Sequence, residues 1–385
     1  MAEAKQGLQS TIRVCHVASG DLWAGAESQA ASLLRALARR PDLTLTVVLL
    51  NEGRLAEEVR TCGLQVKVIP EAHMTFLQIL REARRYLQSR SIRILHSHRY
   101  KENLLAALLA RICRIPWVVR TQHGLPEAPH DLRKYKQKLV QTLDRFVARH
   151  ATDRTISVSE ELRAHLLKHL DPRKVVVIPN GLDTCRVSSR LTPREAKERL
   201  GLPASCRTVG YAGRLEPVKR LDLFLAAAKL ISARMPEARF LIVGDGSEAN
   251  PLRETARATG LEKVVLFLGH RDDIYDVLRA LDVFVLCSDH EGLPMVLLEA
   301  LYLGVPVVAR AVGGITDVIL DGVTGILTDS STPEPLAQAC VDLLTDAERR
   351  ERLSAAAVAS VSEKFTADRN ADQVAALYRA LCGLA

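Results

Sequence analysis

Two cations in the second half of the chain are spaced for binding a phosphorylated ligand. Arg214 and Lys219 lie in the segment GRLEPVK, directly after the apolar run RTVGYAG, which predicts a strand over 207–213. A planar guanidinium and a flexible ammonium at the end of a strand together suit a diphosphate group. Taken alone, the segment is equally consistent with a solvated basic turn.

Two carboxylates follow in the segment SDHEGLPMVLLEA (288–300), after a strand predicted over 283–288. Glu291 falls in a loop, Pro294 suits the first position of a helix, and Glu299 falls in the second turn of that helix. A helix N-terminus can hold a phosphate, and a buried carboxylate can accept hydrogen bonds from sugar or ribose hydroxyl groups. The alternative for Glu291 is a favourable interaction with the helix dipole alone.

The first half contains a glycine loop and a histidine at the ends of predicted strands. Gly20 and Gly25 lie in SGDLWAGAE (19–27), between a predicted strand and a helix, where they allow close backbone approach and an anion at the helix N-terminus. Their spacing is not G-x-G-x-x-G, which disfavours a dinucleotide site and leaves a plain strand–helix turn open. His123 follows the strand predicted over 117–122, and a lone histidine is more often structural than catalytic.

Short apolar runs that alternate with amphipathic stretches position these residues. A run of this kind indicates a buried parallel strand, and alternation with helices indicates right-handed βαβ units. The predicted strands lie at 12–18, 44–50, 65–70, 94–98 and 117–122, and again at 207–213, 238–244, 264–269, 283–288 and 305–309. The sequence therefore predicts an α/β protein of two tandem doubly wound, Rossmann-like domains with a cleft between them. Ligands bind beyond the carboxyl ends of such strands, where the residues above fall.

The charge of the chain is unevenly distributed. The 385 residues carry a formal net charge of +8, and residues 1–185 hold 29 Lys and Arg against 18 Asp and Glu. A helix predicted within 130–150 is basic, with an apolar stripe formed by Leu132, Tyr135, Leu139, Leu143 and Phe146. Such a helix either lies on an anionic membrane surface or packs its stripe on its own core. Aromatic residues make up only 4% of the chain, which disfavours nucleic acid as a partner.

The eight cysteines are scattered without C-x-x-C pairs, which indicates reduced thiols and a cytoplasmic protein. The N-terminal residues have no apolar core typical of a signal peptide, and no apolar stretch reaches the ~18 residues needed to span a bilayer. We therefore expect a cytoplasmic location. If the basic helix lies on an anionic membrane surface, we also expect peripheral attachment to the inner face of the membrane.

Several motifs in order resemble the GT-B glycosyltransferase family 4. In the second half these are GRLxxxK, GDG at 244–246, EGxPxxxxEA with glutamates eight residues apart, GG at 313–314 and DGVTG at 321–325. In the first half they are Gly25-Ala26-Glu27, Val158-Ser159-Glu160 and the segment Pro179–Asp183. Ala24 stands where many relatives have glycine, and Asp317 where glutamate is usual, so the loop details depart from the family.

The resemblance implies a retaining transferase that uses a nucleotide sugar and needs no metal or other cofactor. It places the donor diphosphate against Arg214 and Lys219 and near the Gly20–Gly25 loop. It places Glu299 on the ribose, Glu291 and His123 at the donor sugar as catalytic residues, and the base near Arg271. The remaining donor-sugar and backbone contacts that it implies are Gly292, Leu293, Pro294, Met295 and Val296.

The resemblance also implies three segments. An acceptor-binding domain covers 1–183, a nucleotide-sugar domain covers 184–366, and a C-terminal helix in 367–385 crosses back onto the first domain. The favoured donor is a UDP-linked hexose or N-acetylhexosamine, and the expected acceptor is a glycan or a lipid-linked glycan in polysaccharide or glycolipid synthesis. GDP-mannose as donor, a nucleotide-sugar epimerase and a non-catalytic sugar-nucleotide-binding protein are the alternatives.

Physical chemistry favours the same reaction. Two cations and a helix N-terminus stabilise a leaving diphosphate without a metal. No cluster of Asp, Glu, Cys and His residues has the spacing of metal ligands, so the sequence gives no indication of a metal site. Retention of configuration requires either a carboxylate nucleophile or attack from the face of the leaving group. The sequence offers no unambiguous nucleophile, so we favour front-face attack.

Overall fold

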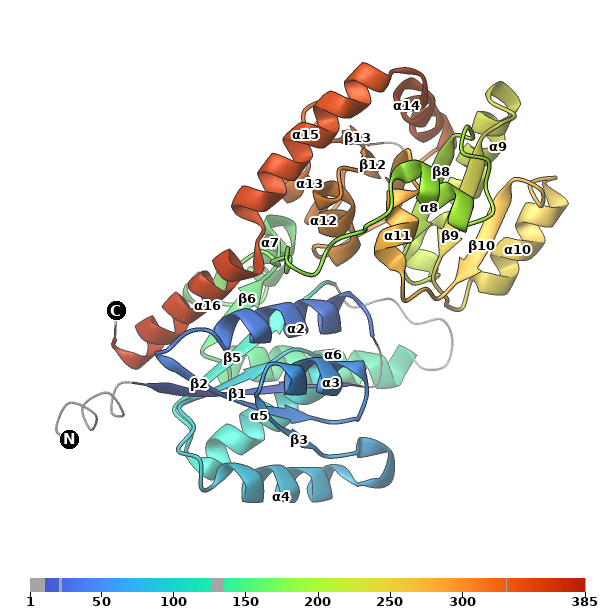
Figure 1. The fold of residues 1–385 in the computed structure, drawn as a ribbon. Helices are drawn as coiled ribbons and strands as arrows, with labels where there is room; N and C mark the ends of the chain where they lie inside the picture. The colour runs from blue at the N-terminus through green and yellow to red at the C-terminus, as the bar shows by residue number, and fades with distance from the viewer. Residues whose placement is uncertain (1–10, 21–22, 126–133, 330, 385) are drawn as a thin grey trace. The chain divides into compact units, whose positions relative to one another are not determined.

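The computed structural model describes residues 11–20, 23–125, 134–329 and 331–384, without the side chains of 134–139. The chain forms two compact units, one of Met1–Gly181 with Ala367–Ala385 and the other of Leu182–Thr366 (Figure 1). Each unit is built on a parallel sheet with helices on both faces. The predicted fold class, two tandem doubly wound α/β units, is confirmed.

The sheet of the first unit has the strand order β3-β2-β1-β4-β5-β6-β7, and all of its strand pairs are parallel. The order reverses direction between β1 and β4, which makes the crevice between these two strands a topological switch point. The described elements of the unit are β1 (Ile12–Ala18), α2 (Gly25–Leu37), β2 (Leu43–Leu49), α3 (Arg54–Thr61), β3 (Gln65–Val68), α4 (Phe76–Leu87), β4 (Ile94–Ser97), α5 (Tyr100–Cys113), β5 (Trp117–Gln122), α6 (Lys134–His150), β6 (Arg154–Ser157), α7 (Glu160–Leu166), β7 (Val175–Val177) and α16 (Ala367–Cys382).

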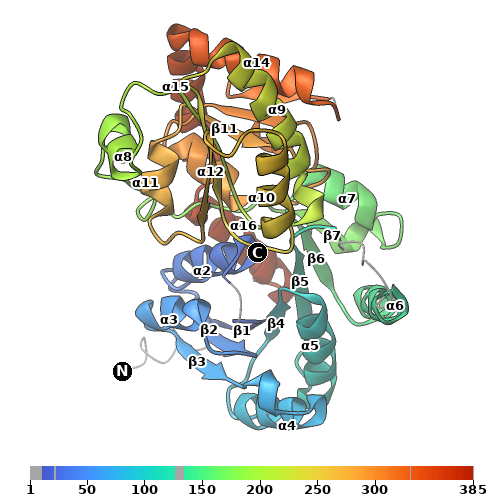
Figure 2. The same cartoon turned by 90° about the vertical axis from the view of Figure 1, so that its right-hand side faces the viewer.

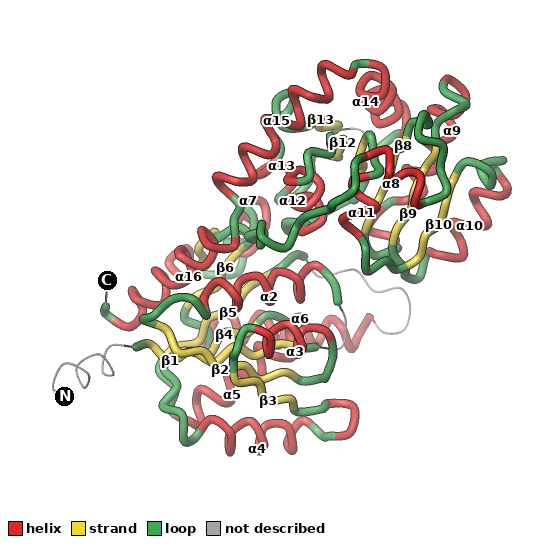
Figure 3. The backbone as a smooth tube through the Cα atoms, in the orientation of Figure 1, coloured by secondary structure: helices red, strands yellow, loops and turns green. Residues whose placement is uncertain are grey.

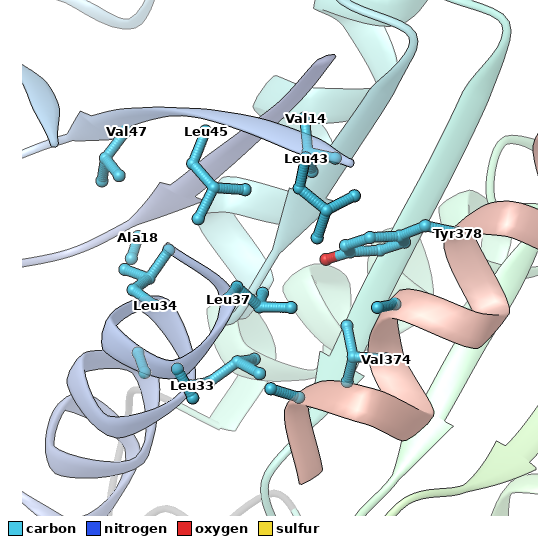
Figure 4. Close-up of a cluster of buried hydrophobic side chains, with 14 of the residues drawn as sticks. Val14, Ala18, Leu33, Leu34, Leu37, Leu43, Leu45, Val47, Val374 and Tyr378 are labelled. Atoms are coloured by element: carbon cyan, nitrogen blue, oxygen red, sulfur yellow. The ribbon is translucent and has the colours of Figure 1, made fainter. Parts of the chain in front are cut away.

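Alternating side chains of the strands supply two separate cores in this unit. Val14 and its neighbours on one face pack under α2, α3 and α16, whereas Cys15 and Val17 on the other face pack under α4 and α5. The last helix thus belongs to the first core, where Val374 and Tyr378 lie against the sheet and α2 (Figure 4). Figure 2 shows α4 and α5 on the opposite side of the sheet.

The second unit repeats this plan with the strand order β10-β9-β8-β11-β12-β13, again parallel and again reversing in the middle, between β8 and β11. Figure 3 colours the strands and helices of this unit by type. The elements of the unit are α8 (Pro193–Arg199), β8 (Thr208–Ala212), α9 (Leu221–Arg234), β9 (Arg239–Val243), α10 (Ala249–Ala258), β10 (Val265–Gly269), α11 (Ile274–Arg279), β11 (Val283–Leu286), α12 (Met295–Tyr302), β12 (Val307–Arg310), α13 (Ile315–Val318), β13 (Ile326–Thr328), α14 (Pro333–Thr345) and α15 (Ala347–Lys364).

The sequence pattern did not predict β6, β7 and β13. β6 (Arg154–Ser157, RTIS) and β13 (Ile326–Thr328, ILT) contain polar residues that interrupt an apolar run. β7 lies in the apolar run 175–178, so it did have a readable signal that the prediction missed. The helix after β11 also begins at Met295, with Pro294 as the residue before it instead of the first helical residue.

Candidate functional site

The cations and carboxylates of the second unit meet at its topological switch point. Lys219 follows β8 in a short 3-10 turn over Pro217–Lys219, and Glu291 follows β11, the neighbouring parallel strand. Because parallel strands end at the same edge of a sheet, loops that are more than 70 residues apart in sequence come together there. Two further contacts join the loops, since the Asp289 amide donates to the Val218 carbonyl at 2.9 Å and the Cys287 thiol to the Lys219 carbonyl at 3.3 Å.

Lys219 and Glu291 form a close ion pair. The ammonium Nζ lies 2.7 and 2.8 Å from the two carboxylate oxygens, and the Ser288 hydroxyl donates to Oε1 at 2.6 Å. The side chains of Lys219 and Glu291 are 16% and 8% exposed. An ammonium has three donors, so Lys219 can hold Glu291 and still contact an anion. The sequence placed these two residues in one site but did not predict that they pair, because only the strand order makes their loops adjacent.

Glycines allow the loops of this edge to touch backbone to backbone. At Gly244, with a φ of +124°, a Cβ atom would lie 1.9 Å from the Gly213 carbonyl oxygen, and at Gly313, with a φ of +56°, it would lie 1.9 Å from the Glu291 carbonyl oxygen. The Gly314 amide donates to the Gly292 carbonyl at 2.7 Å. The GDG and GG motifs are therefore needed for packing around the site, and the second one holds the Glu291 loop in place.

Glu299 is a buried carboxyl group on α12. Burial raises its pKa to about 7, opposed by a hydrogen bond from the Tyr275 side chain. A carboxyl group near half ionisation at neutral pH gains charge when further donors approach it. Glu299 is therefore suited to receive hydrogen bonds from a ligand's hydroxyl groups.

The other predicted residues of this unit also lie in loops that follow strands or at the start of α12. Arg214 is exposed in the loop after β8, and its carbonyl accepts from the buried Tyr211 hydroxyl at 3.0 Å. Arg271 follows β10 and pairs with Asp273 at 2.6 and 2.7 Å. The stretch from Gly292 to Val296 joins the Glu291 loop to α12, and three of its residues are buried: Gly292, Leu293 and Met295.

In the first unit, Gly20 follows β1 and Gly25 begins α2. A Cβ atom at Gly20 would lie 2.4 Å from the Asn51 carbonyl oxygen, so this glycine is required by packing, whereas no atom lies within 4 Å of a Cβ at Gly25. The buried Glu27 accepts a hydrogen bond from the Ala24 amide at 3.2 Å and forms an ion pair with Arg99. Glu27 thus accepts from one of the backbone amide donors at the start of α2. The space beside Gly25, at the start of the helix, is open.

His123 is joined to other histidines that the sequence analysis did not single out. Its Nε2 atom lies 3.4 Å from Nδ1 of His98, and Nε2 of His98 lies 3.1 Å from Nδ1 of His16. His16, His96 and His98 are buried, and one ring nitrogen of each lies within 4.8 Å of the others. The available signal was that His16, His96 and His98 all lie on or just after β1 and β4, the strands of the switch point.

The predicted basic helix exists as α6, and the two residues of its apolar stripe that the structure describes do not pack on its own core. Leu143 and Phe146 are 43% and 61% exposed, and the buried residues of the helix include Asp144, Val147 and Ala148 instead. The packing alternative is therefore wrong for Leu143 and Phe146. Leu132 lies outside the described residues, as do the side chains of Tyr135 and Leu139.

Two parallel, doubly wound units in tandem are the architecture of the GT-B glycosyltransferases. The model of the family "Glycosyl transferases group 1" matches residues 193–359, and that of "Glycosyltransferase Family 4" matches residues 23–186. The chain belongs to glycosyltransferase family 4.

Among characterised relatives, an Escherichia coli UDP-Gal:alpha-D-GlcNAc-diphosphoundecaprenol alpha-1,3-galactosyltransferase is 34% identical over 259 residues, which cover 66% of each chain. A D-inositol 3-phosphate glycosyltransferase of Stackebrandtia nassauensis is 32% identical over 310 residues, covering 74% of this chain and 67% of the relative. The matches thus span about two thirds of the length of these relatives.

Solved structures share the fold. HepE of Anabaena, in complex with UDP and glucose, superposes with a TM-score of 0.83 at 21% identity and covers 96% of this chain and 100% of its own. WaaG, a glycosyltransferase involved in lipopolysaccharide biosynthesis, has a TM-score of 0.73 at 15% identity, covering 97% and 100%.

Proposed function

We propose that the protein is a retaining glycosyltransferase that moves a hexose or N-acetylhexosamine from a UDP-sugar to a glycan or lipid-linked acceptor. The observation that carries the proposal is the Lys219–Glu291 pair at the switch point of the second unit, beside the exposed Arg214. Lys219 and Arg214 receive the diphosphate, Glu299 the ribose, and Glu291 the hydroxyl groups of the donor sugar. The E. coli relative that uses a UDP-linked sugar, and HepE, which binds UDP, support the choice of UDP.

A thermal-shift panel of UDP-, GDP- and ADP-sugars tests the donor. Ligand at 100 times its dissociation constant stabilises the native state by about 2.7 kcal/mol, which raises the melting temperature by several degrees. We expect this shift with UDP-sugars. A shift with GDP-mannose alone would make the protein a mannosyltransferase, and no shift with any nucleotide sugar would contradict the proposal. Turnover of the donor without an acceptor would indicate an epimerase.

Nucleotide binding is expected to release protons from Glu299. Ribose hydroxyl groups that donate to the carboxylate stabilise its charged form, so UDP lowers the pKa from about 7. UDP binding near neutral pH should therefore release protons, and UDP affinity should rise as the pH increases through the pKa of Glu299 in the free protein. Calorimetric titration in buffers of different ionisation enthalpy measures the release. Glu299→Gln is the control, and an equal release from this variant would contradict the assignment.

For the chemical step we propose front-face attack, with the leaving phosphate taking the acceptor proton and no metal required. Glu291 is neutralised by Lys219 and accepts from Ser288, which makes its carboxylate a poor nucleophile. The pair is better suited to orienting the donor sugar. Trapping of a covalent glycosyl-enzyme would overturn this mechanism.

The acceptor is proposed to be anionic. Residues 1–185 carry the excess of basic side chains, and the two relatives above act on a diphosphoundecaprenol-linked sugar and on an inositol phosphate. Leu143 and Phe146 share the exposed surface of α6 with Arg145 and Arg149, a combination that suits an anionic membrane surface. No helix within the described residues is long and apolar enough to cross a bilayer. The cytoplasmic location stays a prediction.

Phe146→Ser is expected to weaken sedimentation with vesicles that contain anionic lipid, because an exposed aromatic ring contributes apolar contact at the lipid interface. The matched control is Leu320→Ser in the second unit, since Leu320 is 63% exposed and Phe146 is 61% exposed. Wild-type protein should sediment with anionic vesicles at low salt and not with neutral ones. Equal binding by wild-type protein and the Phe146 variant would exclude this contact.

A further inference from the structure

The buried histidines of the first unit form one continuous line of hydrogen bonds. Nε2 of His96 lies 2.7 Å from the Thr121 hydroxyl, and Nδ1 of His96 lies 2.5 Å from the Tyr378 hydroxyl. The Tyr378 hydroxyl also lies 3.2 Å from Nε2 of His16. The line continues through His98, as described above, to Nε2 of His123. We name these residues the histidine chain, in this order: Thr121, His96, Tyr378, His16, His98 and His123.

The ring geometry favours well-aligned hydrogen bonds. The His16 and His98 rings are inclined by 22° with centres 5.4 Å apart, and the His98 and His123 rings by 19° with centres 5.6 Å apart. In both pairs, the distance between the ring centres exceeds the distance between the two hydrogen-bonded nitrogen atoms by about two ring radii. The two nitrogen atoms therefore lie close to the line between the ring centres, and each ring points its nitrogen atom at the next ring. A ring nitrogen's lone pair lies in the ring plane, and it therefore meets the N–H of its neighbour.

The histidines of the chain are neutral. Burial lowers the pKa of His16, His96 and His123 well below its usual range, and it lowers the pKa of His98 to about 4. A neutral imidazole has one donor and one acceptor, and a tyrosine hydroxyl has one proton. With every link made and the Tyr378 proton used in one of them, all the donors point the same way, and two arrangements of the whole chain satisfy this condition. If both neighbouring imidazoles donated to Tyr378 instead, its buried hydroxyl proton would have no acceptor among the described residues.

The two ends of the chain decide between these arrangements. If the donors run from Thr121 toward His123, the Thr121 hydroxyl proton is used and His123 carries its proton on Nδ1. If they run the other way, the buried Thr121 hydroxyl proton has no acceptor among the described residues, because Oγ1 makes no other hydrogen bond there. A buried unsatisfied donor is costly, so the first arrangement is favoured.

We propose that the histidine chain fixes the tautomer of His123, with the proton held on Nδ1 for donation to an oxygen atom of a bound ligand. Nδ1 of His123 is buried and has no partner among the described residues, so it is the one end of the chain that awaits a ligand. Thr121, His96, Tyr378, His16 and His98 then act as positioning residues. That this ligand is the donor sugar rests on the proposed function. The tautomer of His123 follows from the histidine chain and does not depend on the proposed function.

Nitrogen NMR of histidine-labelled protein tests the proposal, since protonated and unprotonated ring nitrogens have widely separated shifts. In wild-type protein we expect His123 with its proton on Nδ1. Tyr378→Phe breaks the chain in its middle and should convert His123 to a mixture of tautomers, although Tyr378 makes no hydrogen bond to His123. Tyr86→Phe removes a hydroxyl group from α4 of the same unit and should leave His123 unchanged.

A second pair of variants protects the test against misfolding of the Tyr378 variant. Thr121→Val removes the hydroxyl group at the start of the chain with little change in shape and should also mix the tautomers. Thr121→Ser retains the hydroxyl group and should restore the wild-type spectrum. A His123 tautomer protonated on Nε2 in wild-type protein, or one that neither chain break alters, would overturn the proposal.

Two further measurements separate this role from others. If His123 donates to the ligand, Tyr378→Phe should lower kcat/KM for the donor about three- to tenfold, and it should have no added effect in a His123→Ala background. An additive effect would indicate a structural role for Tyr378. Titration of the wild-type protein with ZnCl2 should show no tight binding site. If zinc instead binds stoichiometrically, and the His98→Gln variant loses this binding, the ring nitrogens are metal ligands.

Discussion

Lys219→Ala is expected to lower kcat for glycosyl transfer by about 100- to 1,000-fold, the usual cost of removing one fixed donor that stabilises charge developing in the transition state. The Nζ atom lies 2.7 Å from the Glu291 carboxylate and is 16% exposed, so it acts from a partly dehydrated position. Its loss removes a cation from the proposed diphosphate site and leaves Ser288 as the remaining side-chain partner of the Glu291 carboxylate within the described part of the chain. Steady-state kinetics with the donor identified by thermal shift measure the effect.

A double-mutant cycle separates the two roles of Lys219. If Lys219 acts partly by orienting Glu291, Lys219→Ala and Glu291→Gln should combine to less than the product of their separate effects. Lys229→Ala is the matched control, because Lys229 is exposed on α9 and should have wild-type kinetics. Unchanged kcat/KM in Lys219→Ala, with a melting temperature near that of the wild type, would show that the Lys219–Glu291 pair takes no part in the reaction.

Gly313→Ala is expected to cost both stability and activity. The new Cβ atom would lie 1.9 Å from the Glu291 carbonyl oxygen, so the loop that carries Glu291 must move. The left-handed backbone at a φ of +56° costs an alanine about 1–2 kcal/mol in addition. A displacement of about 1 Å at a catalytic group can reduce the rate about 100-fold. Denaturant unfolding and kcat/KM measure the two losses.

Gly322→Ala and Gly260→Ala are matched controls for backbone strain. Both glycines have a left-handed φ, +70° and +77°, but no atom lies within 4 Å of a Cβ at either position. These variants should lose about 1–2 kcal/mol of stability and retain activity. If Gly313→Ala is no less stable than the controls and equally active, the contact between Gly313 and the Glu291 loop is not what holds that loop.

The strands were predictable where their apolar runs were long. β1, β8 and β11 sit in the interior of their sheets and are buried along their length, so their sequences read as continuous apolar runs. The short β13 lies at the margin of its sheet and gave no such signal. The position of a residue after a strand was likewise readable, and it sufficed to select Arg214, Lys219, Glu291 and His123.

Contacts between distant segments were not predictable in the same way. Lys219 and Glu291 are 72 residues apart, and Tyr378 lies 362 residues from His16, yet both pairs are hydrogen-bonded. The exposure of Phe146 also differed from the helical pattern, because periodicity identifies an apolar stripe but not which surface covers it.

The sequence by itself determined the fold class, the family and the residue types at the strand ends, because these depend on local runs and spacings along the chain. Only the tertiary structure decided that Lys219 neutralises Glu291, that Gly313 holds the Glu291 loop, and that a tyrosine of the last helix joins the histidines of β1 and β4. The physical reason is that strand order and helix docking bring remote segments within hydrogen-bonding distance, and no local pattern encodes which segments these are.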